Sequence, residues 1–193
     1  MQPSALTVDH VAQSLLGTVI AGHGVRARIT EVEAYGGRDD PASHAFTRTA
    51  RSEIMYGPAG RLYVYRIHTH CCANVVTGPT EQGAAVLLRA AEVIDGIELA
   101  RTRRPTARTD RDLARGPGNL TRALGISMAD RDTDLHDGLP VCLEPDGSAT
   151  AAEISAGPRV GVRRAADVPW RFWLTGDPTV SAYRRHPRAA ARN

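Results

Sequence analysis

The stretch of this chain best suited to chemistry is Ile29 to Tyr35, which contains Glu31 and Glu33 and is followed by His44. Further along, the run Leu62 to Tyr65 carries two tyrosines and leads to Asn74. A carboxylate can deprotonate a water, and aromatic rings stack on flat bases. These residue types indicate a site that grips a flat, polar, aromatic substrate and activates a water beside it.

Side chains alternate along a strand, so Glu31, Glu33 and Tyr35 should share one face. A ring that stacks on a base, with a carboxylate two residues away that reaches the sugar, suits excision of that base. Two glutamates on one strand face also fit a solvated edge. The pattern by itself leaves both interpretations open.

The elements that position these residues follow from hydrophobic spacing and turn residues. Helices are predicted over Val8 to Leu16, from Val93 to Thr102, and over Asn119 to Leu124. Strands or hairpin regions are predicted at Thr18 to Ile20, Val25 to Tyr35, Arg61 to Val76 with a turn near His68 to His70, Ala84 to Ala91, Leu139 to Leu143, Arg159 to Val162 and Arg171 to Thr175.

The irregular order of these elements favours an α+β fold over a doubly wound one. We expect a single domain over residues 1–193, with a curved, mainly antiparallel β-sheet, surrounding helices and a protruding β-hairpin. Gly36 to Ser52 lacks periodicity and should be a long ordered loop, a type that is usually functional. The tail from Tyr183 to Asn193 is basic and is expected to be disordered.

The composition limits the class of protein. All 24 Lys or Arg side chains are arginine, and the net charge is +3. Arginine forks suit phosphate and stack on bases, although a GC-rich genome also explains the bias. The 3 cysteines do not make a disulfide framework. No apolar run approaches the length of a membrane span, and no signal peptide is recognisable, so we expect a cytoplasmic protein.

Eight ordered blocks from Glu33 to Gly176 resemble the alkyladenine (3-methyladenine) DNA glycosylase family. In chain order they read E-A-Y, S-H-A, L-Y-V-Y, C-A-N-V-V, V-L-L-R-A, R-G-P-G-N-L, P-R-V-G-V and W-R-F-W-L-T-G. The resemblance covers most of the chain. It implies a monofunctional enzyme of base excision repair that flips a damaged purine out of duplex DNA and hydrolyses its glycosidic bond.

The resemblance also implies catalytic roles. Glu33 matches the family's general base, so Glu31 receives no catalytic role. Arg89 matches the arginine that helps Glu33 to hold the water. Val160 matches the residue whose backbone carbonyl is the third partner of that water.

The base-binding residues follow in the same way. Tyr35 and Tyr65 match the rings that sandwich the flipped base, and His44 matches the residue that contacts it from the side. Asn74 matches the pocket asparagine whose amide crowds the exocyclic amino group of guanine.

Contacts to the DNA are expected from the hairpin and from the loop before it. His68 matches the wedge that fills the space left by the flipped base, with His70 supporting it. The chain departs from the family here, because the hairpin is one position short and has Thr69 where glycine is usual. Thr49 and Arg51 match a T-x-R-N block in which Ser52 replaces the asparagine.

The chain has no lysine for a Schiff base, so the expected nucleophile is water. No cofactor and no metal are expected. The expected partner is double-stranded DNA with damaged purines, no membrane contact is expected, and the protein should be a monomer near the nucleoid. Cationic 3-methyladenine and 7-methylguanine rank above deaminated or etheno purines, because neutral bases need an acid that the sequence does not reveal.

Three alternatives stay open. The shortened hairpin allows a lesion-binding protein of the same fold with little or no catalysis. His68, His70 and Cys72 share a strand face near Cys71, which allows a zinc-dependent hydrolase, although no zinc-deaminase signature is present. The arginine-rich segments Arg101 to Arg115 and Arg159 to Arg164 suit either phosphate contacts or a solvated face.

Overall fold

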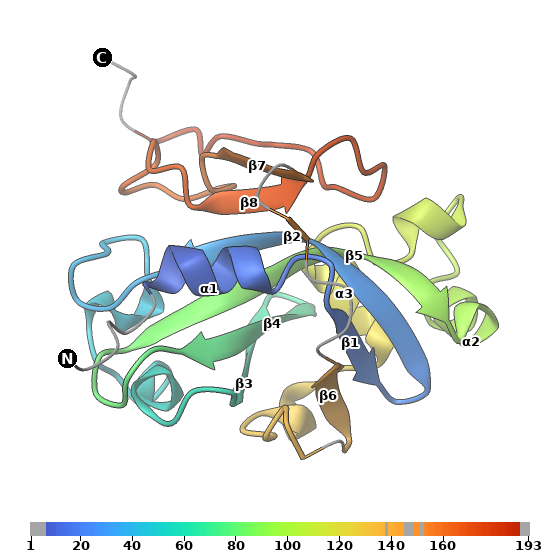
Figure 1. Cartoon of the computed structure of the whole chain (residues 1–193), viewed down its shortest axis with the longest axis horizontal. Helices are drawn as coiled ribbons and strands as arrows, with labels where there is room; N and C mark the ends of the chain where they lie inside the picture. Colours follow the sequence, from blue (N-terminus) through green and yellow to red (C-terminus); the bar gives the residue numbers. More distant parts are fainter. Residues whose placement is uncertain (1–6, 138, 145–148, 151–152, 190–193) are drawn as a thin grey trace.

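Two long strands rich in Val, Leu, Ile and Ala form the middle of the sheet (Figure 1). They are β2 (Val25–Tyr35) and β5 (Ala84–Asp95), which pair antiparallel. The computed structural model describes residues 7–137, 139–144, 149–150 and 153–189.

The other strands extend this pair on both sides, and every pairing is antiparallel. The sheet order is β3-β4-β5-β2-β1-β6, while β8 pairs with β2 and β7 pairs with β8. Their bounds are β1 Val19–Gly22, β3 Leu62–Ile67, β4 His70–Thr77, β6 Val141–Glu144, β7 Ile154–Gly157 and β8 Arg171–Leu174. The sheet curls into an antiparallel half-barrel, which confirms the predicted α+β class.

Short helices cover the curled sheet. Helix α1 (Val8–Ser14) and helix α3 (Pro117–Leu124) each pack against β2 and β5, and α3 also packs against β4. Proline at the first position of α3 is preorganised for a helix start. Gly125 ends α3 in the left-handed conformation at φ 71°, where an L side chain would be strained. Helix α2 (Ile97–Arg103) packs against α3.

The connections in the described part of the chain contain four 3₁₀ helices, and two of them follow β2. They are η1 His44–Phe46, η2 Glu53–Tyr56, η3 Asp110–Asp112 and η4 Met128–Asp130. Ser43 begins η1 by accepting a hydrogen bond from the amide of Ala45 at 3.0 Å. This local cap fixes the direction in which His44 leaves the loop.

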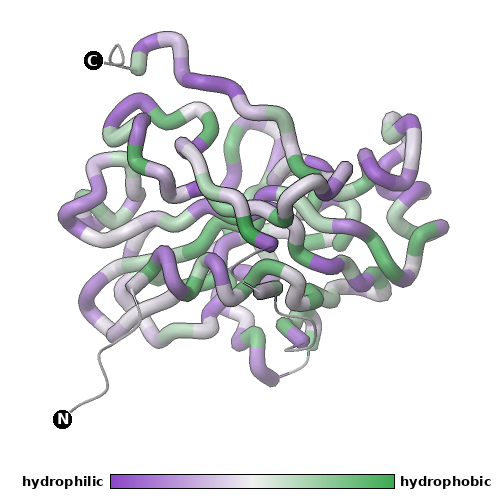
Figure 2. The backbone as a smooth tube through the Cα atoms, turned by 45° about the horizontal axis from the view of Figure 1, so that its top comes forward, coloured by the Kyte–Doolittle hydropathy of each residue, from purple (hydrophilic) through white to green (hydrophobic). Residues whose placement is uncertain are grey.

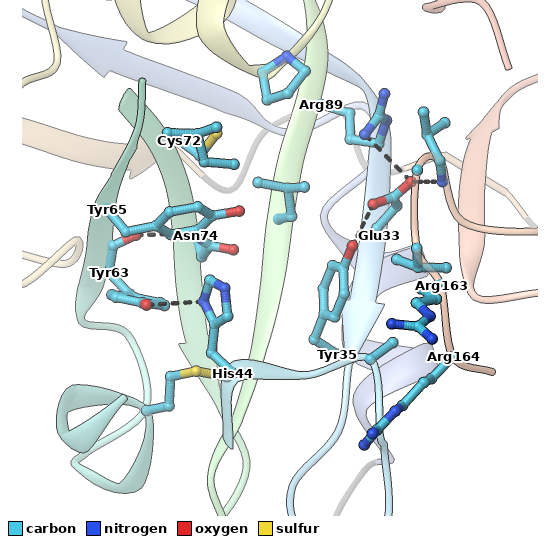
Figure 3. A pocket seen from close by; sticks show the side chains of 18 of the residues that line it. Glu33, Tyr35, His44, Tyr63, Tyr65, Cys72, Asn74, Arg89, Arg163 and Arg164 are labelled. Atoms are coloured by element: carbon cyan, nitrogen blue, oxygen red, sulfur yellow. Dashed lines mark hydrogen bonds and ion pairs between the residues drawn. The ribbon is translucent and has the colours of Figure 1, made fainter. Parts of the chain in front are cut away.

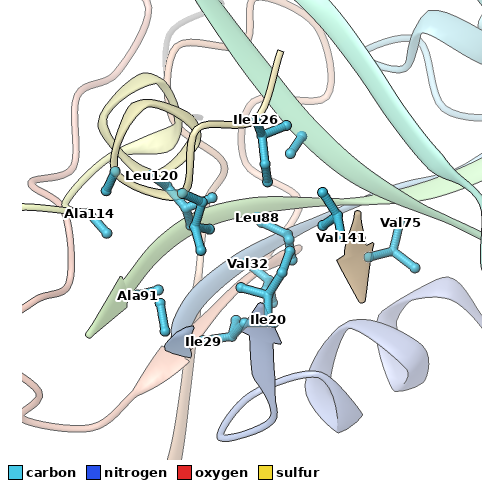
Figure 4. Close-up of a cluster of buried hydrophobic side chains, with 14 of the residues drawn as sticks. Ile20, Ile29, Val32, Val75, Leu88, Ala91, Ala114, Leu120, Ile126 and Val141 are labelled. Atoms are coloured by element: carbon cyan, nitrogen blue, oxygen red, sulfur yellow. The ribbon is translucent and has the colours of Figure 1, made fainter. Parts of the chain in front are cut away.

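The hydrophobic core lies between the sheet and these helices (Figure 4). Leu120 of α3 faces β5 and β2, where Leu88 and Val32 are fully buried. Figure 2 shows hydrophobic stretches in the strands at the centre and hydrophilic stretches in many outer loops. Burial of apolar surface therefore holds β2 and β5 rigidly, and these strands carry the candidate site.

Two predicted elements are wrong. The segment after Ala91 continues as strand β5 to Asp95, and the helix begins only at Ile97, because β2 pairs with the extension. Residues Arg159 to Val162 do not form a strand, since the strand in this region is β7, which ends at Gly157.

Part of the basic C-terminal tail has a defined structure, contrary to the expectation that it is disordered. Residues 183–189 are described, and Arg184 and Arg185 make defined contacts within the domain. Residues 190–193 lie outside the described part of the chain. None of the described helices is long and apolar enough to cross a membrane.

Candidate active site

A cavity of about 460 Å³ opens between β2 and the β3–β4 hairpin (Figure 3). This volume is in the range of small-molecule sites. Its lining includes all seven predicted catalytic and base-binding residues: Glu33, Tyr35, His44, Tyr65, Asn74, Arg89 and Val160. Segments far apart in the sequence therefore meet at one cavity, as the sequence analysis required.

Glu33 is fully buried in β2 and is held by three separate donors. The Tyr35 hydroxyl donates to Glu33 Oε2 at 2.8 Å, and the backbone amide of Val160 donates to Oε1 at 2.6 Å. Arg89 Nη1 lies 3.3 Å from Oε1. Val160 thus reaches this carboxylate through its N–H group, whereas the sequence analysis expected its carbonyl to act on a water.

Glu31 is also fully buried, so the alternative of a solvated strand edge is wrong. Its Oε1 accepts hydrogen bonds from Arg89 Nε at 3.0 Å and from Arg171 at 3.1 Å. Its Oε2 accepts one from the backbone amide of Ser181 at 2.7 Å. Strand β8 and the chain after it pair with this part of β2 and keep both glutamates from solvent.

Arg89 links the two carboxylates from the neighbouring strand β5. Burial by itself lowers the pKa of Arg89, but the negative charges of Glu33 and Glu31 raise it above its ordinary value. The guanidinium therefore stays charged. A buried charge is costly unless it is paired and hydrogen bonded. Ser181 Oγ is a further hydrogen-bond partner of Arg89, at 3.1 Å from Nη2.

Tyr35 ends β2 beside Glu33, and its ring forms one wall of the cavity. Burial, followed by the charge of Glu33, holds the pKa of Tyr35 well above its usual value, so its hydroxyl remains a donor. Arg159 Cζ lies 4.8 Å from the centroid of this ring. Arg159 is only 1% exposed and is paired with Asp40 at 2.6 Å, so it is a buried support and not a phosphate contact.

The opposite wall is aromatic and comes from the hairpin. Tyr63 and Tyr65 of β3 have ring centroids 5.4 Å apart, and the His44 ring meets Tyr65 edge to face at 4.7 Å. His44 Nδ1 lies 3.0 Å from the Tyr63 hydroxyl. Asn74 Nδ2 donates to the Tyr63 carbonyl at 3.0 Å, which fixes the amide orientation in the cavity.

His44 is exposed by its surface area, but its imidazole is partly desolvated where it packs against the tyrosines. Desolvation first, and then the positive charge of Arg51, lower the pKa of His44 to about 4. Its ring is therefore neutral at physiological pH. Burial also raises the pKa of Tyr65 far above its usual value. The aromatic wall consequently presents neutral polar groups to the cavity.

The predicted DNA-contacting residues lie outside this lining. His68 and His70 are exposed at the hairpin tip, where β3 and β4 pair as far as Ile67 and His70. The turn is made by His68 and Thr69, and His68 itself takes the left-handed conformation at φ 50°. The left-handed residue of the turn is therefore His68 and not Thr69, which stands where the family usually has glycine.

Thr49 and Arg51 lie on the exposed loop that follows η1. Ser52, which stands where the family has asparagine, holds this loop by accepting from the Thr49 amide at 2.9 Å. Arg51 Cζ lies 4.8 Å from the centroid of the Tyr65 ring. The loop is therefore attached to the aromatic wall.

The zinc alternative needs a cluster of ligands. Within the described ranges, no group of three or more His, Cys, Asp or Glu side chains is placed to share a metal ion.

The site also includes residues that the sequence analysis missed. Ser181 gave no local signal, because its role depends on contacts with β2 and β5. Exposed Arg163 and Arg164, which were considered only within a longer segment, line the mouth of the cavity.

The fold and the cavity define a class of protein: an α+β protein in which a buried carboxylate faces a cavity with an aromatic wall. Residues 4–178 match the family model described as Methylpurine-DNA glycosylase (MPG). The chain therefore belongs to the methylpurine-DNA glycosylase family, as its sequence blocks indicated. It is a DNA N-glycosylase, a hydrolase of DNA repair.

Similar proteins cover nearly the whole chain. A Nocardia farcinica protein named "Putative 3-methyladenine DNA glycosylase" is 55% identical over 186 residues, 92% of this chain and 88% of that protein. A Mycobacterium tuberculosis H37Rv protein of the same name is 54% identical over 202 residues, 100% of this chain and 98% of its own. A third, from Mycolicibacterium paratuberculosis, is 53% identical over 96% of this chain and 94% of its own.

Proposed function

We propose that this DNA glycosylase flips an alkylated purine into the cavity and hydrolyses its N-glycosidic bond with a water activated by Glu33. The observation that carries the proposal is the burial of Glu33 among three fixed donors at the edge of an aromatic slot. A base inside a duplex hides this bond, so the nucleotide must first be extruded.

In the proposed reaction, Glu33 takes a proton from the water as the water oxygen attacks C1′ of the sugar. The bond between C1′ and the base nitrogen breaks, and its electron pair leaves with the base. Arg89 and the backbone of Val160 hold Glu33 and the water in place. A positioned general base supplies ~10²–10⁴-fold in rate. The chain has no lysine, so a lysine Schiff base is excluded, which supports the proposal of a monofunctional enzyme, with an N-terminal amine as the remaining candidate for a Schiff base.

The cavity walls support the assignment of the base site. Tyr35 lies on one side and Tyr65 on the other, which suits a sandwich of the flipped base (Figure 3). His44 contacts the edge of that base, and Asn74 restricts a bulky exocyclic amino group. Cationic rings bind well to the faces of tyrosines.

The same walls favour cationic lesions such as 3-methyladenine and 7-methylguanine. A neutral base leaves readily only when an acid protonates it. Among the described lining residues, His44 is already neutral with its pKa lowered to about 4, and burial raises the pKa of Tyr65 and of Tyr35. None of these groups is a good acid at neutral pH, so hypoxanthine and ethenoadenine should be released more slowly.

Contacts with duplex DNA are proposed around the cavity mouth. His68 enters the helix as the wedge with His70 behind it, because the hairpin tip is exposed beside the cavity. Arg163 and Arg164 at the rim suit the phosphates next to the flipped nucleotide. Thr49 and Arg51 would contact the strand on the other side. We further propose that the enzyme acts as a monomer and works at the nucleoid.

The test is base release from duplex DNA carrying 7-methylguanine or a single hypoxanthine. Glu33→Gln should lower the single-turnover rate by about 10²–10⁴-fold while lesion binding persists. Glu92→Gln is the matched control, since Glu92 is an exposed carboxylate paired with Arg28 on the same sheet. Tight lesion binding without release by the native protein would instead support the lesion-binding alternative. Equal release by native protein and Glu33→Gln would exclude Glu33 as the base.

A further inference from the structure

The chain after β8 forms a strap, residues Thr179–Arg185, that returns to the carboxylate side of the cavity. Its start is fixed by Thr179, which is buried and whose hydroxyl lies 2.7 Å from that of Thr30 in β2. Its end is fixed by an ion pair between Arg185 and Asp167 at 2.6 Å. The strap follows directly on the segment 4–178 that matches the family model.

Ser181, in the middle of the strap, contacts both charged partners of the candidate base. Its backbone amide donates to Glu31 Oε2 at 2.7 Å, and its hydroxyl oxygen accepts from Arg89 Nη2 at 3.1 Å. One residue thus holds a buried carboxylate and the guanidinium that this carboxylate shares with Glu33. Hydrogen bonds to charged groups are among the stronger ones in proteins.

The strap also holds the other neighbour of Glu33. The backbone amide of Gly161 donates to the Arg184 carbonyl at 2.9 Å, directly after Val160, whose amide binds Glu33. Arg115, before α3, donates to the Val180 carbonyl at 2.9 Å. Two of the three donors around Glu33, Arg89 and the Val160 amide, are therefore set by contacts with the strap.

Glu31 is the second residue that holds Arg89 in place. It is 0% exposed and accepts from Arg89, Arg171 and Ser181. Without Glu31, Arg89 would lose one of its two carboxylate partners and keep Glu33 and Ser181 Oγ, so the orientation of its guanidinium would be less well defined. The paired arrangement keeps Arg89 at the 3.3 Å distance from Glu33.

We infer that the C-terminal strap is a positioning element of the active site, with Ser181 and Glu31 as positioning residues that orient Arg89 for the water held by Glu33. The inference rests on the proposed function, because it assumes that Glu33 and Arg89 act on the water. Neither positioning residue lines the cavity, so both act through Arg89. Their loss should slow the chemical step and leave lesion binding intact.

The test compares Ser181→Ala with Ser181→Thr, which keeps a hydroxyl group. Ser181→Ala should lower the single-turnover release rate by about tenfold, the loss expected for one hydrogen bond to a charged group. The dissociation constant for lesion DNA should stay at the native value, the thermal midpoint should fall by only a few degrees, and Ser181→Thr should restore most of the rate. Ser155→Ala is the matched control, since Ser155 lies on β7, is hydrogen bonded to Thr175 and does not line the cavity.

Glu31→Gln provides the second variant, with a larger loss of rate at similar affinity. A native rate in Ser181→Ala, or a loss of rate that Ser181→Thr does not restore, would overturn the inference. Glu33→Gln in the same assay separates the two proposals. If Glu33→Gln is inactive and Ser181→Ala has the native rate, only the strap inference fails. If Glu33→Gln has the native rate, the proposed function fails and the strap inference with it.

Discussion

Different interactions hold the two walls of the cavity in place. On the carboxylate wall, Glu33 and Arg89 are each less than 10% exposed and are joined to each other and to Glu31 behind them by hydrogen bonds and ion pairs. On the aromatic wall, the Tyr65 ring meets the His44 ring edge to face, a hydrogen bond joins His44 to the Tyr63 hydroxyl, and the hairpin beyond them ends in exposed residues.

This difference matches the two tasks of a base-excising enzyme. A general base must keep its position within a fraction of an ångström, and several directional bonds from separate elements achieve this. A slot for flat rings needs shape and stacking, which tolerate small displacements and several substrates. We therefore expect substitutions on the carboxylate wall to change the rate of the chemical step, and substitutions on the aromatic wall to change binding.

The largest effect is expected for Arg89→Met. It leaves two buried carboxylates without their shared cation, and breaking such a buried pair costs about 3–5 kcal/mol. The thermal midpoint should fall clearly, and base release should lose most of the ~10²–10⁴-fold that a positioned base supplies. Arg61→Met is the control, since Arg61 is 35% exposed and pairs with Asp134 at the surface. Native stability of Arg89→Met would show that the pairs on this wall are weak.

Two tyrosine substitutions compare the walls directly. Tyr35→Phe keeps the ring but removes the donor to Glu33, so the single-turnover rate should fall by about tenfold with little change in affinity. Tyr65→Ala removes a stacking surface, so lesion binding should weaken by ~1–3 kcal/mol. Rates from single-turnover kinetics and dissociation constants from titration would distinguish them. The same division between rate and affinity in both variants would contradict the comparison.

The smallest effect concerns His44 and pH. Folding lowers the pKa of His44 from 6.5 to about 4. Between these two pH values the unfolded chain binds a proton at His44 more readily than the folded protein does. Unfolding is therefore favoured progressively as the pH falls from about 6.5 toward 4. His44→Gln lacks this group, so acid should destabilise it less than the native protein. The difference between its denaturant midpoint and the native midpoint should therefore rise as the pH falls from 7 to 4.5. A constant difference between the two proteins across this range would show that His44 is not desolvated.

The sequence predicted strand β2 with its observed bounds, Val25 to Tyr35, because alternation and branched residues are local properties. It also predicted that helix α3 ends at Gly125, where a left-handed residue is needed. It failed for Val93 to Asp95, which were assigned to a helix but pair with β2. The β-branched Val93 and Ile94 suit a strand, and the pairing with β2 decides where the strand ends.

For the site, the eight sequence blocks that resemble the family identified residues that line one cavity, including Glu33, Tyr35 and Arg89. The blocks could not reveal how those residues are held. Glu31 was assigned no catalytic role, and Ser181 lay beyond the last block. The segment that contains Arg159 suited either phosphate contacts or a solvated face, but Arg159 is buried against Asp40.

By itself, the sequence determined the class of fold and the residue types at the cavity, and its lack of lysine led to the proposal that water is the nucleophile. These features depend on local periodicity and on the chemistry of single side chains. Only the tertiary structure decided that Glu31 and Glu33 are both buried, that Arg89 joins them, and that Ser181 closes the set from the C-terminal strap. Burial and the pairing of charges depend on elements that are distant in the chain and adjacent only after folding.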